Sequence, residues 1–383
     1  MTKTNDFLRM IVVTISLIMI TGIGTAYAVS SPSGTDVGSV SSPSDLNKPQ
    51  VAFTANNVFV SISGSLAREY TPLGVAVQDI DCSSVSPGQF TTGSFFDKDM
   101  NFYLTMFGGS TVCKTDLANT VHSSFGSGYS GSTESILQDA AGNFYVGSVD
   151  GDADIRKFDS AGTPLAQYDV AIENRGSDWI DLAADQKTMY YTSEGVLVKR
   201  YDVSADAQLA DFATLPGGPA YALRLLPSGG LLVAATDKIY RLDGTGAVVD
   251  SYDVTGTSGW FALNLDSDGT TFWSADFASS MVCRFNIATG GGLDNEDICW
   301  STGTGSGTVF GLSVKGEITV SQCPPGQVGS PPDCRIVGGE SLDIDRTALL
   351  IAGFQSSAIW MIPVLAGAAG TGAYYIRTRM NKD

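Results

Sequence analysis

The chain has 383 residues and a formal net charge of −18 at pH 7, and 44 of its residues are glycine. This length accommodates one large β domain with tails, and the glycine content suits many short strands and turns. The acidic balance argues against binding to a nucleic-acid backbone, which requires a surface rich in Lys and Arg.

The amino terminus has the features of a secretory signal, which we expect to cover residues 1–28. Lys3 and Arg9 form a basic start, residues 10–20 form an apolar core, and Ala26-Tyr27-Ala28 fits a cleavage site. An uncleaved anchor helix is the alternative, although the apolar core is short for a membrane span. Residues 29–49 are rich in Ser, Pro and Gly and predict a flexible tether.

From residue 50 to residue 322 the chain repeats one pattern. In residues 135–170 a DAAGN turn precedes the apolar run FYV, then the alternating run IRKFD, then a strand ending in YDV. The apolar second strand recurs every 41 to 46 residues, at Phe59, Tyr103, Tyr145, Tyr190, Leu232, Trp273 and Thr319. A four-stranded meander cannot bury both faces alone, so the repeats predict an all-β β-propeller of four-stranded blades.

The Asp-x-x-Gly-Asn turn and third strands such as IRKFD, VKRYD and IYRLD resemble those of NHL-repeat propellers. The resemblance covers residues 50–322. It implies the fold and leaves function open, because propellers host many unrelated activities.

The number of blades depends on how the ring closes. Seven apolar-x-apolar segments are candidate inner strands, at residues 51–53, 94–96, 136–138, 180–182, 223–225, 263–265 and 312–314. We therefore favour seven blades. In the alternative, the first segment is not a strand, and the two ends of the repeat region share one blade of six, which protects the seam.

Six cysteines lie between the signal and the carboxy-terminal apolar segment, as expected for an oxidising exterior. Fifteen pairings are possible. Pairing sequence neighbours joins third strands to fourth-strand ends and closes a Pro/Gly loop in a stalk at residues 323–347. The predicted pairs are Cys82–Cys113, Cys283–Cys299 and Cys323–Cys334. A metal site is the rival interpretation, but the spacing does not match a zinc ribbon.

Propeller sites form where inner strands converge on the axis. The middle position of three successive inner strands holds Asp181, Arg224 and Asn264, and two residues before the pattern stand Glu134, Asp178 and Tyr221. Carboxylates, an amide and an arginine beside aromatic rings suit a pocket for a polar ligand or a sugar. The alternative is a structural ion pair between Asp181 and Arg224.

A second resemblance, to gluconolactonase-like propellers, implies a divalent metal on the axis. Glu134 and Asp178, with Asp181 and Asn264, have the oxygen chemistry that Ca²⁺ prefers. The sequence departs from that family, because Tyr221 and Phe261 stand where the family has Asn.

Two other features are candidate sites. Asp-rich turns at residues 150–154 and 266–269 could hold Ca²⁺ loosely, although such turns are commonly structural. The chain has a single histidine, His122, and no Gly-x-Ser-x-Gly segment, which argues against Ser/His/Asp and Cys/His nucleophilic catalysis.

Residues 348–376 carry no charge and predict a transmembrane helix, followed by a basic cytoplasmic tail at 377–383. The positive-inside rule then places the propeller outside the cell. This carboxy-terminal segment resembles the anchors of archaeal cell-surface proteins.

The sequence as a whole predicts a surface protein that displays a propeller as a binding or adhesion platform for an extracellular protein or carbohydrate. One alternative is a metal-dependent lactonase-like hydrolase, which requires Glu134, Asp178 and Asn264 to converge. The other is a structural envelope component.

Overall fold

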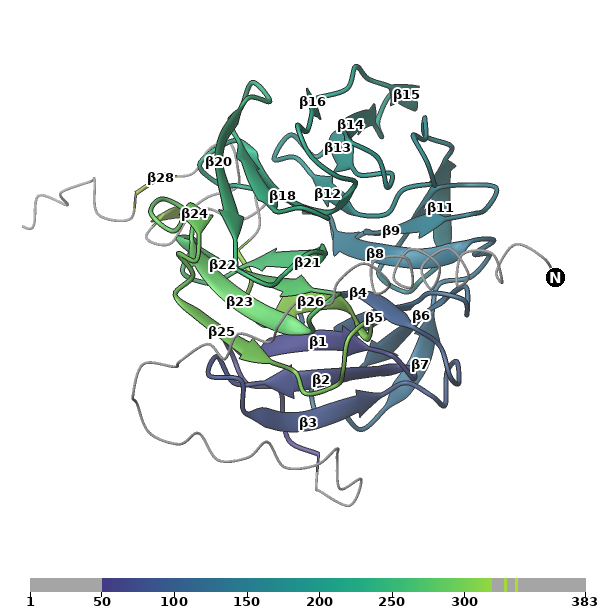
Figure 1. Cartoon of the computed structure of the whole chain (residues 1–383). Coiled ribbons are helices and arrows are strands. Elements are labelled where there is room, and N and C mark those ends of the chain that lie inside the picture. Colours follow the sequence, from purple (N-terminus) through teal and green to yellow (C-terminus); the bar gives the residue numbers. More distant parts are fainter. Residues whose placement is uncertain (1–49, 319–326, 329–334, 337–383) are drawn as a thin grey trace, which may run out of the picture. The chain divides into compact units, whose positions relative to one another are not determined.

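The structure is a computed structural model that describes residues 50–318, 327–328 and 335–336. Residues 50–318 form an all-β propeller of six sheets (Figure 1). Each sheet is a blade with an inner strand nearest the axis. Blade 1 is β26 (Val309–Val314), β1 (Val58–Ile62), β2 (Leu66–Tyr70) and β3 (Ala76–Asp81); blade 2 is β4 (Thr91–Phe96), β5 (Phe102–Met106), β6 (Thr111–Thr115) and β7 (His122–Phe125); blade 3 is β8 (Ser132–Gln138), β9 (Phe144–Val149), β10 (Ile155–Phe158) and β11 (Pro164–Tyr168).

The other three blades follow the same order from inner to outer strand. Blade 4 is β12 (Ile180–Leu182), β13 (Thr188–Tyr191), β14 (Leu197–Asp202) and β15 (Ala207–Gln208), with β16 (Ala213–Thr214) also on β14; blade 5 is β17 (Ala220–Leu225), β18 (Leu231–Ala235), β19 (Ile239–Leu242) and β20 (Val248–Asp253), extended by β24 (Gly292–Leu293); blade 6 is β21 (Trp260–Leu265), β22 (Thr271–Asp276), β23 (Met281–Asn286) and β25 (Ile298–Ser301). Separately, β27 (Gln327–Val328) pairs with β28 (Arg335–Ile336).

The ring closes in blade 1, and the preference for seven blades was wrong. Strand β26 pairs antiparallel with β1, with Val60 opposite Leu312, so the two ends of the repeat region share one sheet. In Figure 1 the purple strands β1 to β3 lie beside the yellow-green β26. Residues 51–53 form no strand; Phe53 instead buries its ring against Phe59, with 5.2 Å between centroids. Thr319 lies outside the described residues.

The repeated second strand forms the hydrophobic core of each blade. Strands β1, β5, β9, β18 and β22 are buried along their whole length. Burying one large apolar side chain contributes about 1.5–3 kcal/mol, so the recurrence at 41–46 residues in the sequence reflects the main source of stability. The closing seam is aromatic: the Trp300 ring of blade 6 lies 4.7 Å from Tyr70 of blade 1 and 6.1 Å from Trp273.

The Asp-x-x-Gly-Asn turn joins an inner strand to a second strand. In blade 3, the Asp139 carboxylate accepts hydrogen bonds from the Asn143 backbone amide at 2.8 Å and from its side-chain amide at 3.0 Å. Gly142 has a φ of 87°, which a residue with a Cβ rarely adopts. The turn predicted from the sequence is therefore confirmed.

Two of the three predicted disulfides are present. Cys82 after β3 bonds Cys113 in β6, and so joins blade 1 to blade 2. Cys283 and Cys299 lie directly opposite each other in β23 and β25 of blade 6 and are also bonded. Cys323 and Cys334 lie outside the described residues.

The predictions for both ends of the chain also fall outside those residues: the signal, the tether, the membrane helix and the cytoplasmic tail. Within the part of the chain that the structure describes, no helix is long and apolar enough to cross a membrane.

Candidate functional site

The inner strands all begin at one face of the propeller and end at the other, which we name the start face and the end face. The predicted site residues divide between them. Glu134, Asp178 and Tyr221 lie at the start face, whereas Asp181, Arg224 and Asn264 lie nearer the end face. The six residues were predicted to share one axial site, but they form two separate groups.

The end-face residues form a closed hydrogen-bond network. The Arg224 guanidinium donates to Glu317 through Nε at 2.9 Å and to Asn264 Oδ1 at 3.1 Å. Glu317 also accepts from the Leu265 backbone amide at 2.9 Å and from the Asn264 side-chain amide. The three side chains thus satisfy one another.

The ion pair at the end face differs from the predicted one. Arg224 pairs with Glu317, which follows β26, and not with Asp181. Asp181 instead accepts the backbone amides of Leu225 at 2.8 Å and Leu182 at 2.9 Å. Burial raises the pKa of Asp181, and the charge of Arg224 acts against that rise. This group has the properties of a structural staple between blades.

The start face is built on irregularities that recur in the inner strands. The pairing shifts register around Glu134 in β8, Tyr221 in β17 and Phe261 in β21, and around Phe310, where β26 pairs with β1. Each is a β-bulge, which adds an unpaired residue and re-aims its side chain. Strand β4 of blade 2 shifts register in the same way between Thr91 and Ser94, so five blades place an unpaired residue at the same end of the axis.

Three carboxylates gather at this face: Glu134, Asp178 and Glu194, with exposed fractions of 3%, 2% and 9%. We name them the carboxylate cluster. Burial, followed by the charge of Glu194, raises the pKa of Glu134 well above its usual value. The same is true of Asp178, through burial and then the charge of Glu134. Burial also raises the pKa of Glu194.

One guanidinium, that of Arg175, opposes the carboxylate cluster. Its Nη1 lies 3.3 Å from Glu194 Oε1, and its Nη2 also binds the carboxylate of Asp150. The Arg175 guanidinium lies 5.7 Å from the centre of the Phe107 ring. Its charge lowers the pKa of Glu134 and of Asp178 without overcoming the effect of burial.

Aromatic rings continue the start face around the axis. Tyr221 stacks on Phe261 with 4.6 Å between ring centroids, and Phe277 lies 5.2 Å from Phe310, which in turn lies 5.0 Å from Phe90. Except for the buried Phe310, these rings are half-buried. We name the five residues the aromatic cluster. Burial, together with the charges of Glu194 and Asp178, raises the pKa of Tyr221, so the two clusters are neighbours.

The expected metal set is not brought together. Asn264 is bonded to Arg224 and Glu317 at the end face, away from Glu134 and Asp178. Within residues 50–318, the one group of three possible ligands with atoms within 4.8 Å of one another is Cys82, Cys113 and His122. Its two sulfurs form a disulfide, so they are not thiolate ligands. The side chains present do not fit the divalent cation that the gluconolactonase resemblance implies.

The Asp-rich turns and His122 have structural partners. In the second turn, Asp266 and Asp268 both pair with Arg284, at 3.0 and 2.9 Å. In the first, Asp154 accepts the Val170 backbone amide at 2.9 Å. His122 Nδ1 lies 2.9 Å from the Thr115 hydroxyl.

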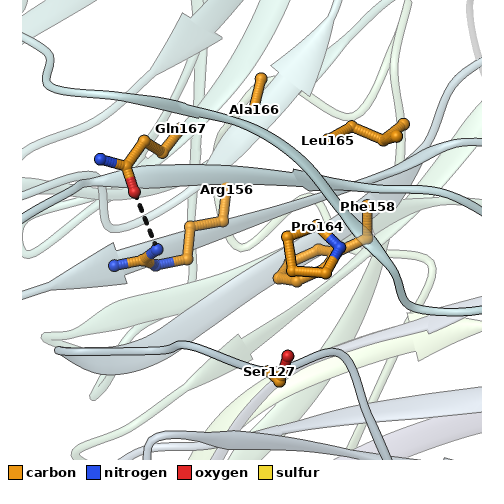
Figure 2. Close-up of a pocket in the computed structure, with 7 residues that line it drawn as sticks. All are labelled: Ser127, Arg156, Phe158, Pro164, Leu165, Ala166 and Gln167. Atoms are coloured by element: carbon orange, nitrogen blue, oxygen red, sulfur yellow. Dashed lines mark hydrogen bonds between the residues drawn. The ribbon is translucent and has the colours of Figure 1, made fainter.

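A depression of about 210 Å³ lies on the outer strands of blade 3 (Figure 2). Its charged side chain, Arg156, donates to Gln167 at 3.1 Å and also pairs with Asp152 at 2.6 Å. Since its arginine is already engaged, we assign no ligand to this depression.

Sequence reasoning missed Glu194, Arg175 and Glu317. Glu194 follows β13, Arg175 precedes β12, and Glu317 follows β26, so all three belong to connecting segments rather than to inner strands.

Comparison with known proteins supports the fold. No model of a protein family matches the chain, and no curated protein matches it. Among solved structures, a chain in the crystal structure of a nidogen/laminin complex matches with a TM-score of 0.56 and 14% sequence identity; the match covers 68% of this chain and 98% of that chain. In all, 1567 chains match, so the likeness identifies a widespread architecture and selects no function.

Proposed function

We propose that the protein is a surface-anchored binding platform that recognises an extracellular protein at the start face of its propeller. The observation that carries this proposal is the set of bulges that turn a carboxylate and three aromatic rings toward the same end of the axis. Bulges of this kind are common beside functional sites because they re-aim side chains. Half-buried aromatic rings are also enriched where proteins bind one another.

The contrast between the two faces supports the choice of the start face. At the end face Arg224, Asn264 and Glu317 bond one another, so a ligand would have to break existing bonds. At the start face Tyr221, Phe261 and Phe277 each keep part of their ring area accessible. The solved structure from a protein complex has the same fold, which suits a binding role, but its low identity carries no partner across.

Site-directed photocrosslinking on intact cells tests this proposal. A photoreactive phenylalanine analogue would be placed at Phe277 on the start face and, as the control, at Leu165 on the outer strand β11, which is 53% exposed. We expect a discrete crosslinked protein band from position 277 and none from position 165. Equal crosslinking from both positions, or none from 277, would contradict a start-face protein site; a crosslinked glycan at 277 would indicate the carbohydrate alternative.

Membrane anchoring is a second part of the proposal and rests on the sequence. The apolar segment 348–376 and the basic residues after it support an outward-facing propeller with a cytoplasmic tail, and residues 1–28 support export. The full chain should sediment with membranes, whereas a chain ending at residue 347 should be released into the medium. Retention of the shortened chain in the membrane would refute a carboxy-terminal anchor and favour an uncleaved amino-terminal one. Kinship with NHL propellers and with archaeal surface proteins likewise stays a proposal.

Lateral assembly through the rim is a second candidate function, and exposed apolar side chains on outer strands favour it. Val249 on β20 is 50% exposed and Leu293 on β24 is 59% exposed. A structural envelope component would self-associate through such residues. Sedimentation velocity of the detergent-solubilised chain, compared with a Val249→Ser, Leu293→Ser variant, tests this: a change from oligomer to monomer supports the assembly, and a monomer before substitution excludes it. We do not propose the lactonase alternative, because its three residues do not converge.

A further inference from the structure

When its members are ionised, the carboxylate cluster carries more negative charge than its surroundings balance. Glu134, Asp178 and Glu194 are each less than a tenth exposed, and Asp150 adds a fourth carboxylate at their edge. The charges that act on Asp178 are those of Glu134, Glu194 and Arg175, two negative and one positive. Buried carboxylates are ordinarily matched by cations or hydrogen-bond donors. This cluster therefore lacks positive charge.

One carboxylate oxygen in the cluster also lacks a hydrogen-bond donor. Asp178 Oδ2 is buried and has no hydrogen-bond partner among the described residues. The Asp178 side chain faces Glu134 and Glu194, which cannot donate to it when ionised. A buried acceptor left in this condition is costly, and in native proteins it usually marks a group that something else must satisfy. An N–H donor that carries positive charge would meet both needs.

The aromatic cluster provides the rest of such a site. Tyr221 is close enough to Asp178 and Glu194 for their charges to raise its pKa, and its ring stacks on Phe261. The face of an aromatic ring attracts cations, and an apolar wall accepts the alkyl stem that carries them. Arg175, lying over Phe107 beside Glu194, already shows one cation held between a carboxylate and a ring.

We propose that the start face binds an alkylammonium or alkylguanidinium group, whose N–H donates to Asp178 Oδ2 while its stem lies against Tyr221 and Phe261. Arg175 is a resident competitor, which neutralises part of the cluster from its edge. This inference deepens the proposed binding function and rests on it. The cation could be a Lys or Arg side chain of a protein partner or a free amine, and these sources share the same chemistry.

Binding should also release protons. The groups around Glu134 and Asp178 are Glu194, Asp150, Arg175, Tyr221 and the hydroxyl of Thr92. Since the pKa of each buried carboxyl is raised, a fraction of them is protonated before binding. A cation favours the ionised form, so affinity should increase with pH.

Isothermal titration of the full chain in detergent tests the proposal with n-butylguanidinium, n-butylammonium and tetramethylammonium. We expect saturable binding of at least one of the first two. Tetramethylammonium, which has the charge and no N–H, should bind more weakly. Asp178→Asn should weaken binding by at least about tenfold, because it removes a charged hydrogen-bond acceptor. Asp99→Asn, at an exposed carboxylate, should leave it unchanged.

Arg175→Met should strengthen cation binding, because it removes the guanidinium that competes for the carboxylate cluster. Melting curves confirm that each variant is folded. Absence of saturable binding to the folded chain, unchanged affinity in Asp178→Asn, or tetramethylammonium binding as tightly as butylguanidinium would each overturn the proposal. If position 277 crosslinks to a protein but the chain binds no cation, the proposed function would be supported and the cation site would be refuted. Tighter binding of acetyl-Gly-Arg-Gly-amide than of butylguanidinium would identify a protein side chain as the source, and equal binding would identify a free amine.

Discussion

Replacing Glu317 with Ala tests whether the end-face network is a structural staple. The Glu317 carboxylate accepts Arg224 Nε and the Leu265 amide, each at 2.9 Å, and the Asn264 side-chain amide, and its side chain is 8% exposed. Removing one partner of a buried ion pair costs about 3–5 kcal/mol, because the other charge stays buried and unpaired. A domain of this kind has about 5–15 kcal/mol of stability in total. The expected loss is therefore a large share of it.

Urea unfolding of the purified chain, followed by tryptophan fluorescence, gives the free energy of unfolding for each variant. Glu317→Gln keeps an acceptor for Leu265 and should lose only about 1–3 kcal/mol. Asp99→Ala removes an exposed partner of Lys98 and should leave the free energy of unfolding unchanged, because solvent screens such a pair. The double variant Arg224→Met, Glu317→Leu should be less destabilised than the sum of its two single variants. A loss below about 1 kcal/mol in Glu317→Ala would refute the staple.

Two further predictions concern pH and the disulfides. The pKa of Glu134 is raised in the folded state, so above the ordinary value of 4.5 the folded chain binds more protons than the unfolded chain, and stability falls as pH rises. The Glu134→Gln variant lacks this proton, so its melting temperature should exceed that of the parent chain by an increasing margin from pH 5 to pH 8. Melting temperatures that stay parallel over this range would contradict the burial argument. The Cys82–Cys113 and Cys283–Cys299 bonds close segments with sequence separations of 31 and 16. Chain entropy predicts that replacing both cysteines of a bond with Ala lowers the free energy of unfolding by about 3.7 kcal/mol for the first bond and about 3.1 kcal/mol for the second. A larger loss for the second, shorter loop in urea unfolding would count against that account.

Local patterns of residues were enough to predict the blades. The second strands at Phe59, Tyr103, Tyr145 and Trp273 were recognised because these blades bury that strand along its whole length, so the apolar run returns with the repeat. The turn at Asp139 was recognised because its hydrogen bonds join residues four apart. Two disulfides followed from the strand assignments: Cys283 and Cys299 lie on the adjacent third and fourth strands of one blade, and Cys82 and Cys113 join the fourth-strand end of blade 1 to the third strand of blade 2.

The number of blades was decided by tertiary structure. Whether residues 51–53 or 309–314 complete the first blade depends on which strand can reach β1 once the ring is formed, and this contact joins residues about 250 positions apart in the sequence. No local pattern separates the two solutions, because both segments are apolar. The hydrophobic requirement is the same in each case, and the geometry of closure makes the choice.

Tertiary structure also divided the polar residues between the two faces. Asp178 lies just before its inner strand, as predicted, whereas Glu134 and Tyr221 lie within β8 and β17 at bulges that leave no mark in the residue pattern. Arg175, Glu194 and Glu317 act on residues of other blades from connecting segments. The sequence by itself determined the repeating unit, because that unit depends on neighbours along the chain. The ring determined the two faces, because Arg224 meets Glu317, and Asp178 meets Glu134, across blades.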